Sequence, residues 1–336
     1  MQKKVFRFST SRVEYYFEGR ISQLKSITGS SKVVFITDQN VFASHGKHFK
    51  NKEVIVLKAG EEFKVQATVD SVIQQLIEKE ADRKTLLVGV GGGVVTDITG
   101  YVASIYMRGI RFGFVPTTLL AMVDASIGGK NGIDVGVFKN MVGIIRQPAF
   151  LLFDSSLLQT LPDSEWRNGF AEIIKHASIK DAAMFRELEQ KDVAYYQKKK
   201  KDLDALIRRN ALLKTKVVQE DEFESGDRKL LNFGHTLGHA LENQYQLSHG
   251  QAISIGMAYA SQLSMQIGGF KSKEKVTALL QRYGLPVSFE FDKVKVIEVL
   301  KMDKKKMKNG INFILLEKIG KAFIKEVSIQ QLFESL

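Results

Sequence analysis

The sequence has no cysteine among its 336 residues. Disulfide bonds and thiolate metal sites are therefore excluded, and a metal would have to be held by histidine, aspartate or glutamate. Every stretch of 18 residues is interrupted by charged residues or glycine, so we expect no membrane-spanning helix. Residues 1–20 contain no apolar core segment. We therefore expect no secretory signal, and a cytoplasmic protein.

The sequence also lacks the marks of a nucleic-acid-binding protein, although its formal net charge is +12. Much of the positive excess lies in short runs at residues 198–201 and 304–308, which have no interleaved aromatic residues and no known binding motif. We therefore expect no nucleic-acid partner. A basic protein can equally attract a small polyanionic substrate.

Strands and helices alternate in the first part of the chain. Apolar, β-branched runs predict strands, and a 3.6-residue apolar period predicts helices. The predicted strands are residues 33–37, 53–57, 85–90, 111–115 and 150–154, and the predicted helices are residues 64–79 and 94–107. This alternation is typical of a parallel α/β sheet. Ligands bind outside the carboxyl ends of such strands.

Three consecutive glycines, residues 91–93, follow one of these strands. They fit neither the dinucleotide fingerprint nor a P-loop. Two interpretations stay open on spacing alone. The backbone amides bind a phosphate at the helix N-terminus, or the glycines form a tight strand-to-helix turn. The glycine-rich, polar residues 119–143 are expected to form a long functional loop.

Beyond Leu161-Pro162 the pattern is nearly all helical, closed by a hairpin of residues 312–316 and 322–325. The expected fold class is thus α/β plus α. Residues 1–156 form an α/β domain, and residues 157–336 form a mostly helical domain.

Residues 228–252 hold three of the six histidines. His235 and His239 are four residues apart, which places both imidazoles on one face of a helix. His249 begins a second apolar helix, so the histidines can converge on a metal ion. The spacing alone is also compatible with an ordinary pair of helix residues.

Seven motifs occur in one order along the chain. They are GGGVVTDITGYVASIYMRG (91–109), VPTTLLAMVDASIGGKNGID (115–134), KNMVG (139–143), NGFAEIIKH (168–176), DEFESGDRKLLNFGHTLGHALE (221–242), SHGQA (248–252) and MDKK (302–305). In these motifs the chain resembles the dehydroquinate synthase family over nearly its whole length.

The resemblance implies a lyase of the shikimate pathway, which leads to chorismate and the aromatic amino acids. Such an enzyme converts 3-deoxy-D-arabino-heptulosonate 7-phosphate to 3-dehydroquinate and phosphate. It uses NAD as a recycled cofactor and a divalent metal, zinc or another such as cobalt. The family arginine at position 108 is contributed by a neighbouring subunit, which implies a homodimer.

Residue roles follow from the same resemblance. The implied metal ligands are Glu172, His235 and His249. The implied substrate and catalytic residues are Arg108, Lys130, Asn140, Lys175, Lys214, Glu224, Arg228, Asn232, His239 and one lysine of the pair Lys304-Lys305, with Lys305 preferred. Arg228 and Lys214 match the positions that hold the substrate carboxylate, and His239 is expected to face the substrate.

The implied NAD-binding set lies in the first half of the chain. It comprises Asp38, Asn40, Glu61, Lys64, Gly92, Gly93, Val94, Asp97, Thr117, Thr118, Asp124, Lys130 and Lys139. Simpler interpretations stay open for some of these. Asp97 could act only on the helix dipole, and Glu61 and Lys64 could be an exposed pair. Among the substrate residues, Glu224 could form a surface salt bridge with Arg228.

The chain departs from the usual family pattern at Thr96, Asn131, Phe138 and Gln251. These departures cluster near the expected cofactor site and the glycine-rich segment. They bear on affinity and on the exact substrate more than on the type of reaction. Three alternative functions stay open. They are another sugar-phosphate cyclase of the inosose or valiolone type, an NAD- and metal-dependent polyol dehydrogenase, and a basic binding protein without enzymatic activity.

Overall fold

The computed structural model describes residues 1–136, 138–303 and 310–335. The chain forms two compact units. The first comprises Met1–Glu165 and Lys200–Phe223, and the second comprises Trp166–Lys199 and Glu224–Leu336. Residues 157–165 and Lys200–Phe223, which were expected in the helical half, group with the first unit. None of the described helices is long and apolar enough to cross a membrane.

The first unit is built on a seven-stranded sheet in the order β1-β2-β9-β6-β5-β3-β4. The sheet is mixed rather than purely parallel, because β1 pairs antiparallel with β2 while the other pairs are parallel. Its elements are β1 (Gln2–Arg7), β2 (Arg12–Phe17), α1 (Leu24–Thr28), β3 (Val33–Asp38), α2 (Gln39–His45), β4 (Glu53–Leu57), α3 (Gln66–Glu78), β5 (Leu86–Gly91), α4 (Gly93–Ile105), β6 (Arg111–Pro116), β7 (Lys130–Val135), β8 (Phe138–Ile145), β9 (Phe150–Leu152) and α8 (Lys200–Glu220).

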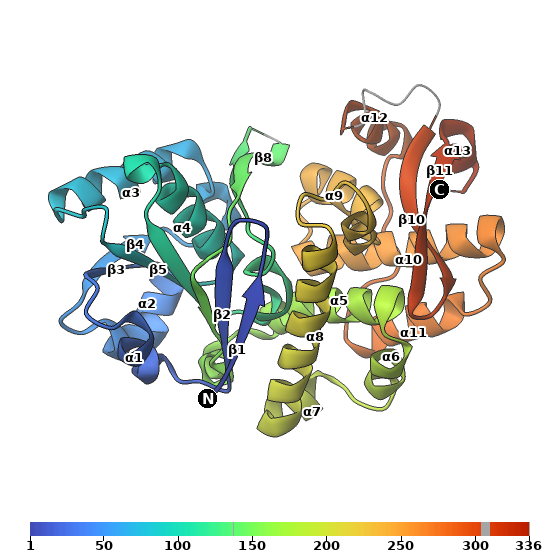
Figure 1. Ribbon diagram of the computed structural model, residues 1–336. Helices are drawn as coiled ribbons and strands as arrows, with labels where there is room; N and C mark the ends of the chain where they lie inside the picture. Colours follow the sequence, from blue (N-terminus) through green and yellow to red (C-terminus); the bar gives the residue numbers. More distant parts are fainter. Residues whose placement is uncertain (137, 304–309, 336) are drawn as a thin grey trace. The chain divides into compact units, whose positions relative to one another are not determined.

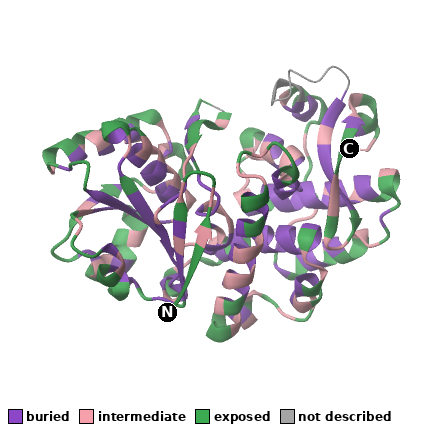
Figure 2. Cartoon of the chain, in the orientation of Figure 1, coloured by how far each residue is buried: buried purple, intermediate pink, exposed green. Residues whose placement is uncertain are grey.

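Helices cover both faces of this sheet, with α3 and α4 on one side and α1 and α2 on the other (Figure 1). The strand β5 is buried at every position, as its unbroken apolar run predicts. Its side chains join a core with Tyr16, Phe35 and Val115. Figure 2 shows this buried centre under an exposed outer surface.

The order of the strands creates a switch point in the sheet. From β3 the chain moves outward to β4, and then crosses to β5 on the opposite side of β3. Helices α2 and α4 therefore leave the carboxyl ends of neighbouring strands in opposite directions. The crevice at such a point is where open α/β sheets bind ligands.

Residues 119–143 differ from the expected long loop. They contain a π-helix at Ala121–Ala125, labelled η5, and most of the antiparallel hairpin of β7 and β8. The expectation of an irregular segment was therefore wrong. The strands β1 and β2 were also not expected.

The second unit is mainly helical. Its elements are α5 (Asp163–Lys180, which begins in the first unit), α6 (Ala182–Glu189), α7 (Val193–Lys198), the 3-10 helix η7 (Asp227–Asn232), α9 (His235–Gln244), α10 (His249–Gly268), α11 (Lys273–Arg282), α12 (Lys293–Asp303), β10 (Gly310–Lys318), β11 (Lys321–Ser328) and α13 (Ile329–Ser335). Leu263 of α10 packs in one core with Leu241 of α9 and Leu315 of β10. Figure 2 shows α10 largely buried.

Candidate active site

A carboxylate and two imidazoles converge in the second unit. Glu172 lies in the middle of α5, while His235 and His249 are the first residues of α9 and α10. Glu172 Oε1 is 2.9 Å from His249 Nε2 and 3.5 Å from His235 Nε2. One donor atom from each of the three residues lies within 4.8 Å of the others. The structure thus brings together the three residues expected to be metal ligands.

Glu172 is fully buried yet ionised. Burial by itself raises the pKa of this carboxyl group, but Lys175 and the two histidines together hold it well below its usual range. Lys175, one turn further along α5, pairs with the second carboxylate oxygen and is itself buried. A buried carboxylate in this state has the charge that a divalent cation requires.

The surroundings shift the pKa values of the two imidazoles in opposite directions. Burial and the nearby Lys175 lower the pKa of His235, and its Nδ1 lies 3.2 Å from the carbonyl oxygen of Phe233. A proton on Nδ1 leaves Nε2 available as a ligand. Burial also lowers the pKa of His249, but Glu172 and Glu242 outweigh it and raise the pKa to about 10. A raised pKa means that protons and a metal ion compete for His249.

The donor set fits a catalytic metal site. Two imidazoles and one carboxylate are three protein ligands of the kind that bind zinc while leaving a coordination position for water or substrate. Among the described residues, His239 is not part of this cluster. Its ring lies edge-on to His235, with centroids 5.0 Å apart.

Close packing of α9 on α10 positions the histidines. Gly234 precedes His235 with a φ of 81°, and a Cβ there would lie 2.8 Å from the carbonyl oxygen of Ile253. Residue 234 must therefore be glycine for α9 to begin so close to α10. Asn168 of α5 then fixes the start of α10, because its Oδ1 accepts hydrogen bonds from Gly250 N and Ser248 Oγ, both at 2.9 Å.

The segment before α9 carries three more of the expected residues. Arg228 lies in η7 and is only 2% exposed. The side chain of Arg228 is therefore not exposed on the surface. Glu224 adopts a left-handed backbone conformation with a φ of 59°, and its Oε1 accepts a hydrogen bond from Asn232 Nδ2 at 2.9 Å.

In the first unit, expected cofactor residues line the switch point. Asp38 ends β3, Gly92 and Gly93 begin α4, and Thr117 follows β6. Asp38 also caps α2, because its Oδ1 accepts a hydrogen bond from Val41 N at 2.9 Å. The N-cap residue of α4 is Gly92, which offers no capping side chain, so the first amides of α4 are oriented to bind an anion.

Lys64 joins two groups of expected residues. Its buried Nζ lies 2.6 Å from Asp97 Oδ2 and 2.6 Å from Asn140 Oδ1, and 3.7 Å from Glu61 Oε1. Glu61 and Lys64 are therefore not an exposed pair, and Asp97 has an ionic partner besides the helix dipole. Burial raises the pKa of Asp97 even though Lys64 opposes the shift.

Asp134 was missed by the sequence analysis. Its Oδ1 accepts a hydrogen bond from Asn140 N at 2.7 Å, and its own backbone N donates to Lys64 O at 2.8 Å. Asn140 is thereby held in a left-handed conformation, with a φ of 53°. In the sequence, Asp134 is only a lone acidic residue in an apolar stretch. Its contact with Asn140 can be recognised only once the β7–β8 hairpin is known.

The remaining expected residues take varied positions. Lys214 Nζ lies 2.8 Å from both Oδ1 and the carbonyl oxygen of Asp124, which is in the π-helix η5. Such π-helical turns are frequent at functional sites. Arg108, Lys130 and Asn40 are exposed, whereas Val94, Thr118 and Lys139 are half-buried. Lys304 and Lys305 lie outside the described residues.

Three departures from the family pattern have local roles. Thr96 Oγ1 donates to Gly93 O at 2.9 Å within α4. Asn131 Nδ2 donates to Gly129 O at 2.7 Å and Arg146 O at 2.9 Å across the hairpin base. Gln251 Oε1 accepts a hydrogen bond from Ser248 N at 2.9 Å, which completes a capping box before His249.

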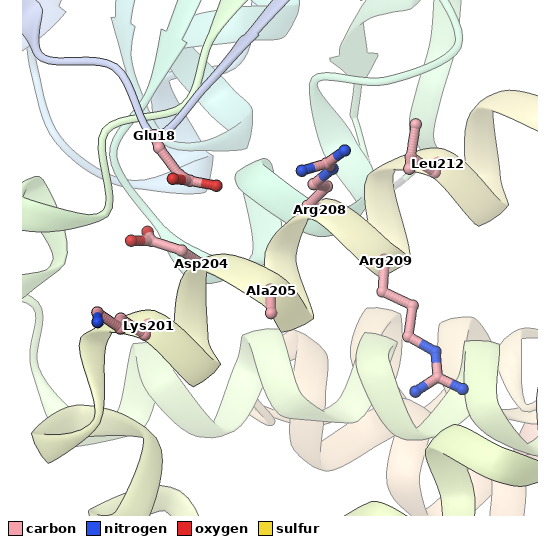
Figure 3. Close-up of a pocket in the computed structure, with 7 residues that line it drawn as sticks. All are labelled: Glu18, Lys201, Asp204, Ala205, Arg208, Arg209 and Leu212. Carbon is pink, nitrogen blue, oxygen red and sulfur yellow. The ribbon is translucent and has the colours of Figure 1, made fainter. Parts of the chain in front are cut away.

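A hollow of about 470 Å³ lies elsewhere in the first unit, along α8. It is lined by side chains of both charges, Glu18, Lys201, Asp204, Ala205, Arg208, Arg209 and Leu212, and Figure 3 shows Arg209 turned away from Glu18. None of the expected site residues lines it. The hollow therefore contributes nothing to the candidate active site.

Comparisons with known proteins agree with this geometry. Residues 54–168 match the family model "3-dehydroquinate synthase N-terminal", and residues 169–306 match "3-dehydroquinate synthase C-terminal". The 3-dehydroquinate synthase of a Nitratiruptor species is 40% identical over 312 residues, which cover 89% of this chain and 88% of the relative. The chain belongs to the 3-dehydroquinate synthase family. The expectation of an enzyme with this activity, in the shikimate pathway, is thereby confirmed.

Further relatives extend this result. The 3-dehydroquinate synthase of Campylobacter jejuni subsp. jejuni serotype O:23/36 (strain 81-176) is 37% identical over 332 residues, or 94% of this chain and 95% of the relative. As an enzyme of this family, the protein acts on a sugar-phosphate substrate.

Solved structures of related cyclases share the fold of this 3-dehydroquinate synthase family member. A 2-deoxy-scyllo-inosose synthase complexed with carbaglucose-6-phosphate, NAD+ and Co2+ superposes with a TM-score of 0.87 at 25% identity, covering 99% of this chain and 98% of that chain. The 2-epi-5-epi-valiolone synthase of Streptomyces hygroscopicus subsp. jinggangensis 5008, with NAD+ and Zn2+ bound, gives 0.88 at 26% identity, with 99% and 97% covered. The expected fold class is confirmed.

Proposed function

We propose that this enzyme converts 3-deoxy-D-arabino-heptulosonate 7-phosphate to 3-dehydroquinate and phosphate, with NAD regenerated in each cycle and a divalent metal, zinc or cobalt, held by Glu172, His235 and His249. The observation that carries the proposal is the convergence of these three side chains within 4.8 Å. Their chemistry suits a metal with an open position for a substrate oxygen.

The residues around this cluster have separate tasks. When bound, the metal supplies a Lewis acid that lowers the pKa of a substrate hydroxyl. Glu172 is the negatively charged ligand of the proposed metal site. Lys175 keeps that carboxylate ionised when the metal is absent. His239, whose ring abuts His235, moves a proton on the substrate side.

The cofactor proposal rests on the switch point of the first unit. The amides at the start of α4, at Gly92, Gly93 and Val94, bind the pyrophosphate of NAD. Asp38 holds a ribose from the carboxyl end of β3. The other proposed contacts are Asn40, Glu61, Lys64, Asp97, Thr117, Thr118, Asp124, Lys130 and Lys139. When bound at these residues, NAD would supply a hydride acceptor that can be regenerated within the cycle.

The substrate proposal assigns two anionic groups to different residues. The guanidinium of Arg228 offers a bidentate fork to the carboxylate, and Lys214 adds a second positive charge. Lys130, Asn140, Arg108 and Lys305 bind the phosphate. Asn232 and Glu224, which are hydrogen-bonded to each other, orient the reacting end of the substrate.

The proposed assembly is a homodimer in which Arg108 serves the partner's site. Arg108 is exposed, and its backbone has a φ of 65°. Met107 beside it has a φ of 49° and is 42% exposed, and Ile105 is 41% exposed. Left-handed backbone at two successive non-glycine residues is costly, and such strain is concentrated at functional sites. Exposed apolar side chains beside it support burial against a second copy.

The deciding experiment follows phosphate release and NADH absorbance together. Purified enzyme is given zinc, the heptulosonate phosphate and NAD at a concentration far below that of the substrate. We expect phosphate release to exceed the added NAD many times over, without net NADH, because the cofactor is restored in each cycle. Phosphate release that stops at one equivalent of NAD would contradict the proposal.

Related cyclases provide the control substrates. Glucose 6-phosphate and sedoheptulose 7-phosphate carry a phosphate but no carboxylate, so they leave Arg228 without its proposed partner. We expect no measurable turnover of either. Efficient turnover of one of them, with little use of the heptulosonate phosphate, would assign the enzyme to the inosose or valiolone type. Steady NADH accumulation with simple polyols would instead indicate a dehydrogenase.

A further inference from the structure

Glu242 is a half-buried acidic residue of α9 for which the proposed function has no role. It lies seven residues after His235, two helical turns along the same face. Its side chain is 7% exposed, and its Oε2 lies 3.6 Å from His249 Nδ1. One face of α9 thus presents an expected metal ligand at its start and a carboxylate near its end, both directed at the same cluster.

His249 has partners on both ring nitrogens. Its Nε2 is 2.9 Å from Glu172 Oε1, and its Nδ1 faces Glu242. An imidazole that offers Nε2 to a metal carries its proton on Nδ1, and that proton needs an acceptor. His235 has an acceptor of this kind in the carbonyl oxygen of Phe233, 3.2 Å from its Nδ1.

We propose that Glu242 is the positioning residue of the metal site, accepting the Nδ1 proton of His249 so that Nε2 is fixed toward the metal. The inference rests on the proposed metal site and adds to it. Glu242 selects one of two tautomers, fixes the rotation of the ring and places a second negative charge near the cation. All three effects strengthen metal binding without direct contact between Glu242 and the metal.

Backbone geometry assigns this task to a side chain. His249 is the first residue of α10, and the hydrogen bonds around it hold the helix start, with Asn168 bonded to Gly250 N and Ser248 Oγ. These bonds fix the backbone of His249 and leave its ring free to rotate about χ1 and χ2. Glu242 and Glu172, on opposite sides of the ring, remove that freedom.

The test measures metal affinity in three forms of the protein. Metal is stripped with a chelator, and Zn2+ is titrated back against a competing chromophoric chelator. The Glu242→Gln variant keeps a side chain of the same length with an acceptor oxygen, but it loses the negative charge. We expect it to bind Zn2+ about 10- to 100-fold more weakly than the wild type. The matched control is Glu274→Gln on α11, the same chemical change at an exposed position, which should bind as the wild type.

Two further readouts separate positioning from simple structural support. Circular dichroism should show that metal-free Glu242→Gln keeps the wild-type fold, while the visible absorption bands of bound Co2+ should change because the ligand field of His249 is altered. If Glu242→Gln does not fold, Glu242→Asp decides, since it keeps the charge but withdraws it by one methylene. We expect an intermediate loss of affinity for this variant.

The outcomes distinguish this inference from the proposed function. If the wild type binds no Zn2+ or Co2+, the proposed metal site fails, and the role of Glu242 fails with it. If the wild type binds metal and the Glu242 variants bind equally well with unchanged Co2+ bands, the metal site stands and the positioning role is overturned. Weaker binding with altered bands, in a variant that keeps the wild-type fold, supports it.

Discussion

Arg228 illustrates what burial adds to sequence at the scale of a single residue. The sequence left two interpretations, a surface salt bridge with Glu224 and a contact with the substrate carboxylate. At 2% exposure Arg228 does not lie on the surface, and this burial favours the second interpretation. Asp134, by contrast, is a residue whose role the sequence did not suggest at all. Its contact with Asn140 depends on a hairpin that residue types alone did not predict.

Replacement of Arg228 tests the carboxylate contact. We expect Arg228→Ala to lower kcat/KM for the heptulosonate phosphate, with a loss of about 3 kcal/mol of transition-state stabilisation. The reason is that the carboxylate of the bound substrate would lose its charge-assisted hydrogen-bond donors. Arg228→Lys should recover only part, since an ammonium cannot form the bidentate pair. Steady-state kinetics on both variants provide the measurement.

Lys229 is the matched control for this prediction. It is the next residue of η7, also cationic, but exposed, and its Nζ donates to the carbonyl oxygen of Ser225 at 2.9 Å. Lys229→Ala should leave kcat/KM near the wild-type value. An Arg228→Ala enzyme as active as Lys229→Ala would remove Arg228 from the site.

At the scale of elements, apolar periodicity predicted most helices and parallel strands but failed for the hairpin β7–β8. The many glycines of residues 119–143 suggested a loop. In the structure, a Cβ at Gly132 would lie 2.7 Å from the carbonyl oxygen of Val142 on the facing strand, and one at Gly143 would meet the backbone of Asn131. These glycines permit close strand approach, which composition alone cannot distinguish from loop flexibility.

The edge pair β1–β2 predicts how stability depends on pH. Glu14 of β2 contacts Lys3 Nζ at 2.9 Å, Arg12 Nη2 at 2.7 Å and Tyr16 OH at 2.6 Å. Burial raises its pKa, but these three partners outweigh burial and lower the pKa from 4.5 to about 2. A depressed pKa means that the contribution of Glu14 to stability is present above pH 4.5 and is lost as the pH falls toward 2.

Glu14→Gln tests this dependence. We expect the variant to be less stable than the wild type at pH 7 by about 1–2 kcal/mol, allowing for solvent screening, and the difference to shrink as the pH falls from 4.5 to 2. Urea unfolding at several pH values measures it. The control is Glu53→Gln on the other edge strand β4, where the pair with Lys79 is exposed. A difference independent of pH would contradict the ionic role of Glu14.

At the scale of the whole molecule, chain order did not predict the grouping of α8 (Lys200–Glu220) with the first unit. This helix follows the second unit's first helices in sequence and nevertheless belongs to the first unit. Its Thr215 is buried and hydrogen-bonded to Tyr15 at 3.0 Å, across 200 positions of sequence. Such long-range contacts leave no local periodicity in the sequence, so they were not predictable without an alignment of relatives.

Assembly is the last property to test at this scale, and mixed subunits can test it. Arg108→Ala and Glu172→Ala should each abolish activity, the first by loss of a phosphate contact and the second by loss of the metal. If Arg108 acts on the partner's site, a hybrid dimer contains one site with an intact Glu172 and an intact incoming Arg108. Equal mixing with free exchange should then restore roughly a quarter of wild-type activity, since half the dimers are hybrids with one working site of two. If Arg108 acts within its own chain, each site of the hybrid lacks one residue, and no activity returns. Sedimentation of the mixture, which must show dimers, is the control that makes an inactive mixture count against the shared site.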